Sequence, residues 1–233
     1  MAKRSHLDTH LGSYEQVCGW LYLPFYLFLL ALALRFALKL LDFPLTAFQF
    51  QLACAVLNFA LTLLLFHRFL FHSLGNILPN FWAFVQAVIL GFVFYFAINW
   101  VLNWAFSYLA PGLVIPEGAL VASMAETNYG ATLVCTVLLA PLTEEVLMRG
   151  LVFGTIARRS RYLAYLVSIL LFAALHLWQY ALSISIPELL LCAVTYIPAG
   201  LALGWTYEKS GNFWASFLVH AAINAVLLGL YPF

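Results

Sequence analysis

Charged residues are scarce in this sequence. Lys, Arg, Asp and Glu make up 8% of its 233 residues, whereas hydrophobic residues make up 65%. A soluble domain of this length normally carries about a quarter charged residues. Apolar stretches of about 20 residues, long enough to cross a bilayer, recur along the whole chain and leave only short connections. The composition therefore excludes a soluble globular protein and predicts a multi-pass integral membrane protein that has the lipid bilayer as its surroundings.

Cysteine and basic clusters are scarce as well. The cysteines lie in or beside apolar segments and have no CxxC spacing: Cys18, Cys54, Cys135 and Cys192. This pattern argues against a disulfide framework and a thiolate zinc site and is typical of small packing residues. No basic cluster with interleaved aromatic residues is present, and the formal net charge is +1. We therefore expect no nucleic-acid partner.

The apolar runs predict helices, because barrel strands would alternate in polarity over about ten residues. We expect an all-α bundle of about seven transmembrane helices, with a count between six and eight. The expected spans are residues 17–41, 45–66, 80–106, 131–157, 162–181, 187–207 and 212–231. Residues 107–130 contain two prolines and three glycines and predict a loop with a short interfacial helix. Pro141 and Pro198 each remove a backbone hydrogen bond inside a span and predict a local kink or loosening.

The basic residues predict the orientation, since cytoplasmic loops retain Lys and Arg. The N-terminal segment MAKRSHLDTH is basic, but the apolar run after it is too long for a signal-peptide core, so we expect a retained first span. A cytoplasmic N-terminus places most basic residues on one side, namely Lys3, Arg4, Arg68, Arg158, Arg159, Arg161 and Lys209. Arg35 and Lys39 then approach the other side, together with the acidic residues Glu117, Glu126 and Glu188.

A few ionisable residues lie inside the spans. Each costs at least about 2.5 kcal/mol to insert into the membrane, so each is a functional candidate. The candidates are Glu144, Glu145, Arg149, His176 and His220, with Asn224 on the same helical face as His220. At about 1.5 Å per residue from the basic turns, Glu144, His176 and Asn224 reach depths of about 21–22 Å and His220 about 16 Å. Groups from three spans therefore reach one layer of the bilayer, which favours a shared catalytic site over scattered packing residues.

The spacing suggests separate roles. Glu145 and Arg149 form an (i, i+4) pair in the favourable order, so we expect them to neutralise each other. Glu144 points about 100° away from Glu145 around the helix and is a candidate general base. We expect Glu144 and His176 to activate a water molecule, and His220 and Asn224 to donate hydrogen bonds to the resulting oxyanion.

These residues resemble three motifs of one known family. EEVLMR (residues 144–149) resembles EExxxR, FAALH (172–176) resembles FxxxH, and HAAIN (220–224) resembles HxxxN. The motifs are those of the CPBP family, the CAAX proteases and bacteriocin-processing proteins, also called the abortive-infection family, which includes the type II CAAX prenyl endopeptidase. The resemblance covers about residues 131–231. It implies helices arranged around an intramembrane catalytic cavity that opens to the cytoplasmic side and to lipid.

By motif position, the resemblance implies specific roles for the candidate residues. Glu144, His176, His220 and Asn224 correspond to catalytic positions, and Glu145, Arg149 and Phe172 to supporting ones. We expect residues 131–233 to form the catalytic core and residues 1–130 the N-terminal helices and outer loop of the same membrane-embedded unit. The family is commonly called metalloproteases, and Glu144, His176 and His220 would supply a ligand set that suits zinc. We favour a metal-free glutamate mechanism, because a liganding glutamate could not also be the free base and no HExxH motif is present.

The expected function is that of an intramembrane endopeptidase. Its partner would be a hydrophobic or lipid-modified peptide at the membrane, as in a prenylated or leader-bearing protein. The alternative is a non-proteolytic bacteriocin-immunity or binding protein of the same fold. A proton-coupled transporter would predict inverted repeats, and the two halves show no such correspondence. The expected location is a bacterial plasma membrane or an endoplasmic reticulum membrane.

Overall fold

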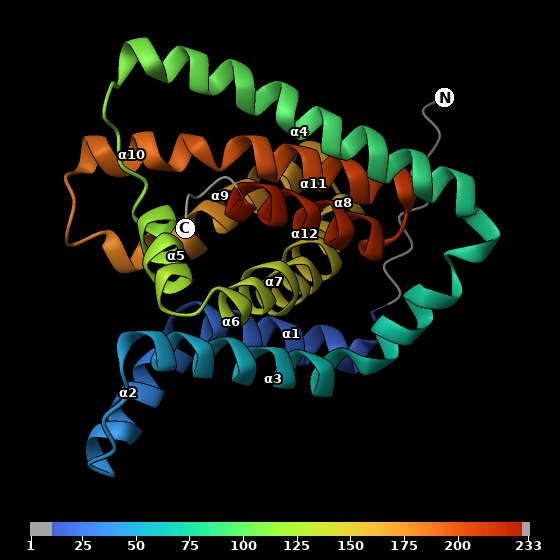
Figure 1. Cartoon of the computed structure of the whole chain (residues 1–233). Helices are drawn as coiled ribbons and strands as arrows, with labels where there is room; N and C mark the ends of the chain where they lie inside the picture. Colours follow the sequence, from blue (N-terminus) through green and yellow to red (C-terminus); the bar gives the residue numbers. More distant parts are fainter. Residues whose placement is uncertain (1–10, 230–233) are drawn as a thin grey trace.

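The computed structural model describes residues 11–229, and every secondary-structure element among them is helical (Figure 1). The helices are α1 (Ser13–Pro24), α2 (Leu30–Leu40), α3 (Ala47–Gly75), α4 (Phe81–Leu109), α5 (Pro116–Thr127), α6 (Tyr129–Val134), α7 (Ala140–Glu145), α8 (Gly154–Ala157), α9 (Arg161–Leu177), α10 (Ile186–Thr195), α11 (Ile197–Ser210) and α12 (Phe213–Gly229). Shorter helical segments connect them, π-helical in η1 (Phe25–Leu29), η3 (Cys135–Leu139) and η4 (Val146–Phe153), and 3₁₀-helical in η2 (Leu78–Asn80) and η5 (Trp178–Tyr180). The predicted all-α fold is confirmed.

Six continuous helical stretches of the described chain are long and apolar enough to cross a membrane. They are Ser13–Leu40, Ala47–Gly75, Leu78–Leu109, Tyr129–Ala157, Arg161–Tyr180 and Ile186–Ser210. The seventh predicted span corresponds to α12, which is apolar but shorter, and the predicted end of that span at residue 231 lies outside the described residues. The second span was predicted to end at residue 66, but α3 continues to Gly75, because polar residues after the apolar run still propagate the helix. Lys3 and Arg4 also lie outside the described residues.

The bundle is layered, with the spans from the first half of the chain on its outside. α4 packs along α11 and α12, whereas α3 packs against α7 and against α1 (Figure 1). α7 and α12 lie between these outer layers and contact each other. Many large apolar side chains on the outer helices are exposed, as Leu21, Phe36, Trp82 and Trp100 illustrate. Such a surface is costly in water and suits contact with lipid.

Proline breaks the regular helical geometry where the sequence predicts. The π-helical segment η3 ends two residues before Pro141, and the sixth span divides at Tyr196 into α10 and α11, with Pro198 in the first turn of α11. Proline lacks the N–H that an uninterrupted helix requires at that position. The expected loosening at both sites is therefore confirmed.

A buried glutamate joins the first two spans at a kink. α3 bends at Phe66, whose φ and ψ of −118° and 17° are not helical. The backbone N–H of Phe69, just beyond the bend, donates to Glu15 Oε1 at 2.8 Å, and the Gly12 N–H donates to Glu15 Oε2 at 3.0 Å. Since buried backbone donors need a partner, Glu15 stabilises both the kink and the start of α1.

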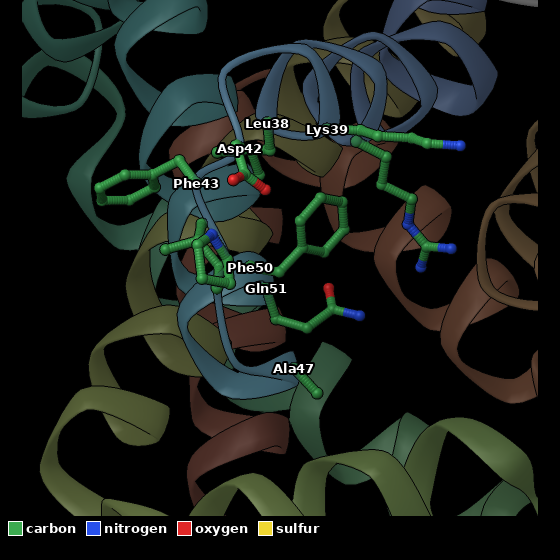
Figure 2. Close-up of a pocket in the computed structure, with 10 residues that line it drawn as sticks. Leu38, Lys39, Asp42, Phe43, Ala47, Phe50 and Gln51 are labelled. Carbon is green, nitrogen blue, oxygen red and sulfur yellow. The ribbon is translucent and has the colours of Figure 1, made fainter.

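A shallow hollow of about 430 Å³ lies at the corner between α2 and α3 (Figure 2). Arg35, Lys39, Asp42 and Phe50 help to line it, and the Arg35 guanidinium lies 4.9 Å from the centre of the Phe50 ring. The hollow shares no lining residue with the cavity described below and contains no histidine. We therefore assign it no part in catalysis.

Candidate active site

The ionisable residues predicted from the sequence meet inside the bundle. Glu144 and Glu145 end α7, and Arg149 lies one turn further along in η4. His176 lies near the end of α9, and His220 lies in the middle of α12. All of them except His176 are buried, and the side chain of His176 is 13% exposed. The expectation that three separate spans contribute to one cluster agrees with these positions.

Glu145 has two partners, of which the sequence predicted one. Arg149 Nη1 donates to Glu145 Oε1 at 3.0 Å, and both side chains are fully buried. His220 Nδ1 lies 2.9 Å from the same oxygen. A carboxylate accepts, so Nδ1 of His220 donates its proton to Glu145 and the ring turns its Nε2 toward Glu144. Glu145 therefore orients a histidine in addition to balancing the charge of Arg149.

Glu144 faces two imidazole rings. Its Oε2 lies 3.8 Å from His176 Nε2 and 3.9 Å from His220 Nε2. This oxygen is buried and accepts no hydrogen bond from the protein. The other ring nitrogen of His176, Nδ1, lies 2.8 Å from the Phe172 carbonyl oxygen and must carry a proton, since a carbonyl can only accept. In the neutral form of His176, the Nε2 lone pair is therefore on the side of Glu144.

Asn224 is positioned by the proline-induced break. In η3 the Ala140 N–H donates to the Cys135 carbonyl, one residue further back than in an α-helix. Pro141, the next residue, has no N–H to offer, so the Thr136 carbonyl needs another donor. Asn224 Nδ2 donates to that carbonyl at 2.8 Å. The side-chain amide has two N–H groups, and Asn224 also lines the cavity described below.

Two aromatic rings enclose the histidines. The Phe172 ring centre lies 5.0 Å from the Arg149 guanidinium carbon, 4.7 Å from the His176 ring and 5.6 Å from the His220 ring. Tyr196 also packs against His176, with the ring centres 4.7 Å apart, and lies 6.3 Å from the Phe172 ring. These contacts fit the supporting role predicted for Phe172. Tyr196 was not predicted, although its position two residues before Pro198 is the signal that could have indicated it.

The cluster borders a cavity of about 690 Å³. Its lining combines the predicted residues Glu144, Phe172, His176, His220 and Asn224 with apolar side chains from α5, α11 and α12. Glu145 and Arg149 are not among the lining residues, so they lie behind the wall that Glu144 and His220 form. A largely apolar cavity with a few convergent polar groups is typical of a small-ligand or peptide site.

Several polar lining residues were missed from the sequence, four of them on α4 and α5. Asn99 and Asn103 were interpreted as an interfacial or packing face, but both line the cavity together with Tyr95. Their spacing of four residues along α4 places all three on one helical face, which is the signal that could have identified them. Glu117 lines the cavity from α5, in the segment that the sequence indicated to be an outer loop with a short helix. The short helix is confirmed.

The cavity lies toward one end of the bundle. α5 contributes to its lining and is joined through Asn128 to the start of the fourth span. The Arg158–Arg161 turn follows the opposite end of that span. Figure 1 shows α6 beside α5 and α8 farther toward the other end of the bundle. The basic residues predict that the Arg158–Arg161 turn is cytoplasmic, which places the cavity toward the opposite side of the membrane. The family resemblance instead implies a cavity that opens to the cytoplasm, so the two expectations conflict for this chain.

The donor atoms do not match the geometry of zinc. Ligand atoms at about 2.0–2.1 Å from a tetrahedral zinc ion lie about 3.4 Å apart. Glu144 Oε2 is 3.8 Å and 3.9 Å from the two histidine nitrogens, so the three groups are more widely spread. No set of three His, Cys, Asp or Glu side chains within residues 11–229 is arranged to hold a metal ion. We derive no catalytic step through a metal.

Comparison with known proteins finds a family that is similar to the part of the chain that contains these residues. Residues 127–226 match the family described as type II CAAX prenyl endopeptidase Rce1-like. A curated relative, UPF0177 protein YxdF of Lactococcus lactis subsp. lactis (strain IL1403), is 30% identical over 90 residues, which cover 37% of this chain and 42% of that protein. The chain thus matches less than half the length of this relative. No solved structure matches the chain. The matched region contains all three motifs, and residues 127–226 are therefore similar to the type II CAAX prenyl endopeptidases over the part of the chain that carries the cluster.

Proposed function

We propose that this chain is an intramembrane endopeptidase that hydrolyses a peptide bond in a hydrophobic or lipid-modified, membrane-associated peptide. The observation that carries the proposal is the buried Oε2 of Glu144, which has no hydrogen-bond partner in the protein and faces Nε2 of both His176 and His220 across 3.8–3.9 Å. These distances exceed a direct hydrogen bond and suit a bridging water molecule. The match of residues 127–226 to CAAX-type endopeptidases supports the same reaction class.

In the proposed reaction, a water molecule donates one hydrogen to Glu144 Oε2 and the other to His176 Nε2. Glu144 removes a proton as the water oxygen attacks the carbonyl carbon of the scissile bond. The carbon–nitrogen bond then breaks, and Glu144 returns the proton to the leaving amine. His176 keeps its orientation throughout, because its Nδ1–H is bonded to the Phe172 carbonyl.

His220 and Asn224 are proposed to stabilise the oxyanion of the tetrahedral intermediate. Since Nδ1 of His220 already donates to Glu145, its Nε2 can donate only when the ring is an imidazolium. Asn224 contributes the amide N–H that is not bonded to the Thr136 carbonyl.

Glu144→Gln tests the proposal, because the amide keeps the size of the side chain and cannot act as a base. We expect hydrolysis to fall by about 10²–10⁴-fold, the usual contribution of a general base. Membrane peptidomes of cells with the wild-type protein and with the variant are compared by mass spectrometry, and accumulation of an uncleaved precursor names the substrate. Glu126→Gln is the matched control, since Glu126 is exposed and lies outside the cavity.

Two further results separate this proposal from its alternatives. If a folded Glu144→Gln protein retains the full cellular phenotype, proteolysis is not the basis of that phenotype, and an immunity or binding function replaces it. We propose that the reaction needs no metal. Elemental analysis of active, detergent-purified protein tests this point, and stoichiometric zinc that is lost together with activity would contradict it.

A further inference from the structure

The cavity contains a second carboxylate that the proposed reaction does not use. Glu117, in the first turn of α5, lines the cavity together with Glu144 and His176. α5 packs against α6 and α9, and α9 contributes Phe172 and His176 to the cavity lining. The Glu117 carboxyl interacts electrostatically with His176 favourably and with Glu144 unfavourably, and burial raises its pKa above the ordinary value of 4.5. Glu117 is thus close enough to the proposed catalytic pair to act on a substrate held there.

Apart from its two histidines, the cavity wall carries charges of one sign. Glu117 and Glu144 are its acidic residues, and no Lys or Arg of the described chain lines it. Arg149, the buried cation nearest to the site, donates to Glu145 behind the wall. A cavity that is lined by one sign of charge and has apolar walls concentrates ligands of the opposite charge. The two histidines reduce this effect only when they are protonated.

Such a wall distinguishes peptides by charge. A carboxylate brought beside Glu117 and Glu144 is repelled and loses its hydration without gaining a partner. A lysine or arginine side chain gains a charge-assisted hydrogen bond in the same place. An uncharged peptide lies between these extremes. The free carboxylate of a protein C-terminus is therefore a poor ligand for this cavity.

We propose that Glu117 is a specificity-determining residue that selects substrates with a lysine or arginine side chain close to the cleaved bond. The inference rests on the proposed function, because it assumes that a peptide occupies the cavity beside Glu144. Glu117 contacts the substrate in this view and takes no part in proton transfer. An acidic residue in the first turn of a helix also favours the helix dipole, so the test must separate peptide selection from stabilisation of α5.

The experiment uses the full chain, purified in detergent, and three short Leu/Ala-rich peptides blocked at both ends. The peptides differ only in one central residue, which is Lys, Gln or Glu. Binding is measured by fluorescence anisotropy, and cleavage by mass spectrometry. We expect the wild-type protein to bind the Lys peptide about tenfold more tightly than the Gln peptide, as expected for a partly solvated charge-assisted bond. The Glu peptide should bind most weakly.

Variants of α5 show whether Glu117 causes this order. Glu117→Gln should bring the Lys and Gln peptides to nearly equal affinity, and Glu117→Lys should reverse the order in favour of the Glu peptide. Glu126→Gln, an exposed carboxylate of the same helix, should leave the order unchanged. A purely structural role would lower thermal stability without reversing the charge preference.

Two outcomes overturn the inference. One is equal affinity of the wild-type protein for all three peptides, including no detectable binding, and the other is a full Lys preference in Glu117→Gln. The proposed function fails separately, if Glu144→Gln still cleaves at the wild-type rate. Loss of cleavage in Glu144→Gln together with an unchanged preference in Glu117→Gln therefore removes only the inference about Glu117.

Discussion

Removing one member of the buried Glu145–Arg149 pair should destabilise the protein far more than removing both. The two side chains are fully buried and are joined by a 3.0 Å hydrogen bond. Arg149→Met leaves the buried Glu145 carboxylate without its guanidinium, and Glu145→Gln leaves the buried Arg149 guanidinium without its hydrogen-bonded carboxylate. Breaking a buried ion pair in this way costs about 3–5 kcal/mol. For a chain of this size, the loss corresponds to a fall in Tm of roughly 6–20 °C.

The double variant tests the origin of this cost. Replacing a buried pair by neutral groups is often nearly neutral, so Glu145→Gln combined with Arg149→Met should recover at least half of the loss in Tm. Tryptophan fluorescence during heating in detergent measures all four proteins of the cycle. Arg161→Met is the control, because Arg161 is 56% exposed and pairs with Glu208 at 2.8 Å. The Arg161 side chain is largely solvated, and the buried Glu208 keeps the hydrogen bond from Tyr165, so this variant should lose less stability than either variant of the fully buried pair. If the fall in Tm of the double variant equals the sum of the falls in the two single variants, this result would falsify the account of mutual neutralisation.

Three other predictions concern parts of the chain away from the catalytic cluster. Glu15→Ala should cost about 1–3 kcal/mol, because the buried Phe69 N–H loses its acceptor, and an unchanged Tm in thermal unfolding would refute this role. Burial raises the pKa of Glu117, so the folded state holds this proton more tightly than the unfolded state. The Tm of the wild-type protein should therefore fall relative to Glu117→Gln as the pH rises from about 4 to neutrality, and a rise would contradict the assigned burial. If the basic residues set the orientation, Arg159→Cys should react with an impermeant thiol reagent only from the cytoplasmic side and Glu126→Cys only from the other side; the reverse labelling would place the cavity end in the cytoplasm.

Much of the architecture follows from local properties that a sequence displays. A bilayer needs about 20 apolar residues per helical crossing, and runs of this length predicted the spans to within a few residues at most ends. The main exception is α3, which continues to Gly75. The Glu145–Arg149 pair was also predictable, since residues four apart on a helix are neighbours whatever surrounds them.

Other contacts depend on how the helices are rotated. The regular helical period relates residues along a span only while the pitch is constant, and η3 and η4 change the pitch on both sides of α7. The hydrogen bond from His220 to Glu145 and the approach of His220 to Glu144 both depend on that change of pitch. The bond from Asn224 to the Thr136 carbonyl arises because η3 and Pro141 leave this carbonyl without its helical donor.

The sequence by itself determined that this protein is a membrane helix bundle and predicted that its ionisable groups share one depth, because hydrophobic length and helical rise act along a single span. Only the tertiary structure decided which polar groups share the cavity. Asn99 looked like a packing residue and Glu117 like part of an outer loop, yet both line the same space as Glu144. Their roles depend on how α4 and α5 pack against distant helices, and packing between spans far apart in the chain leaves no periodic signal in the sequence.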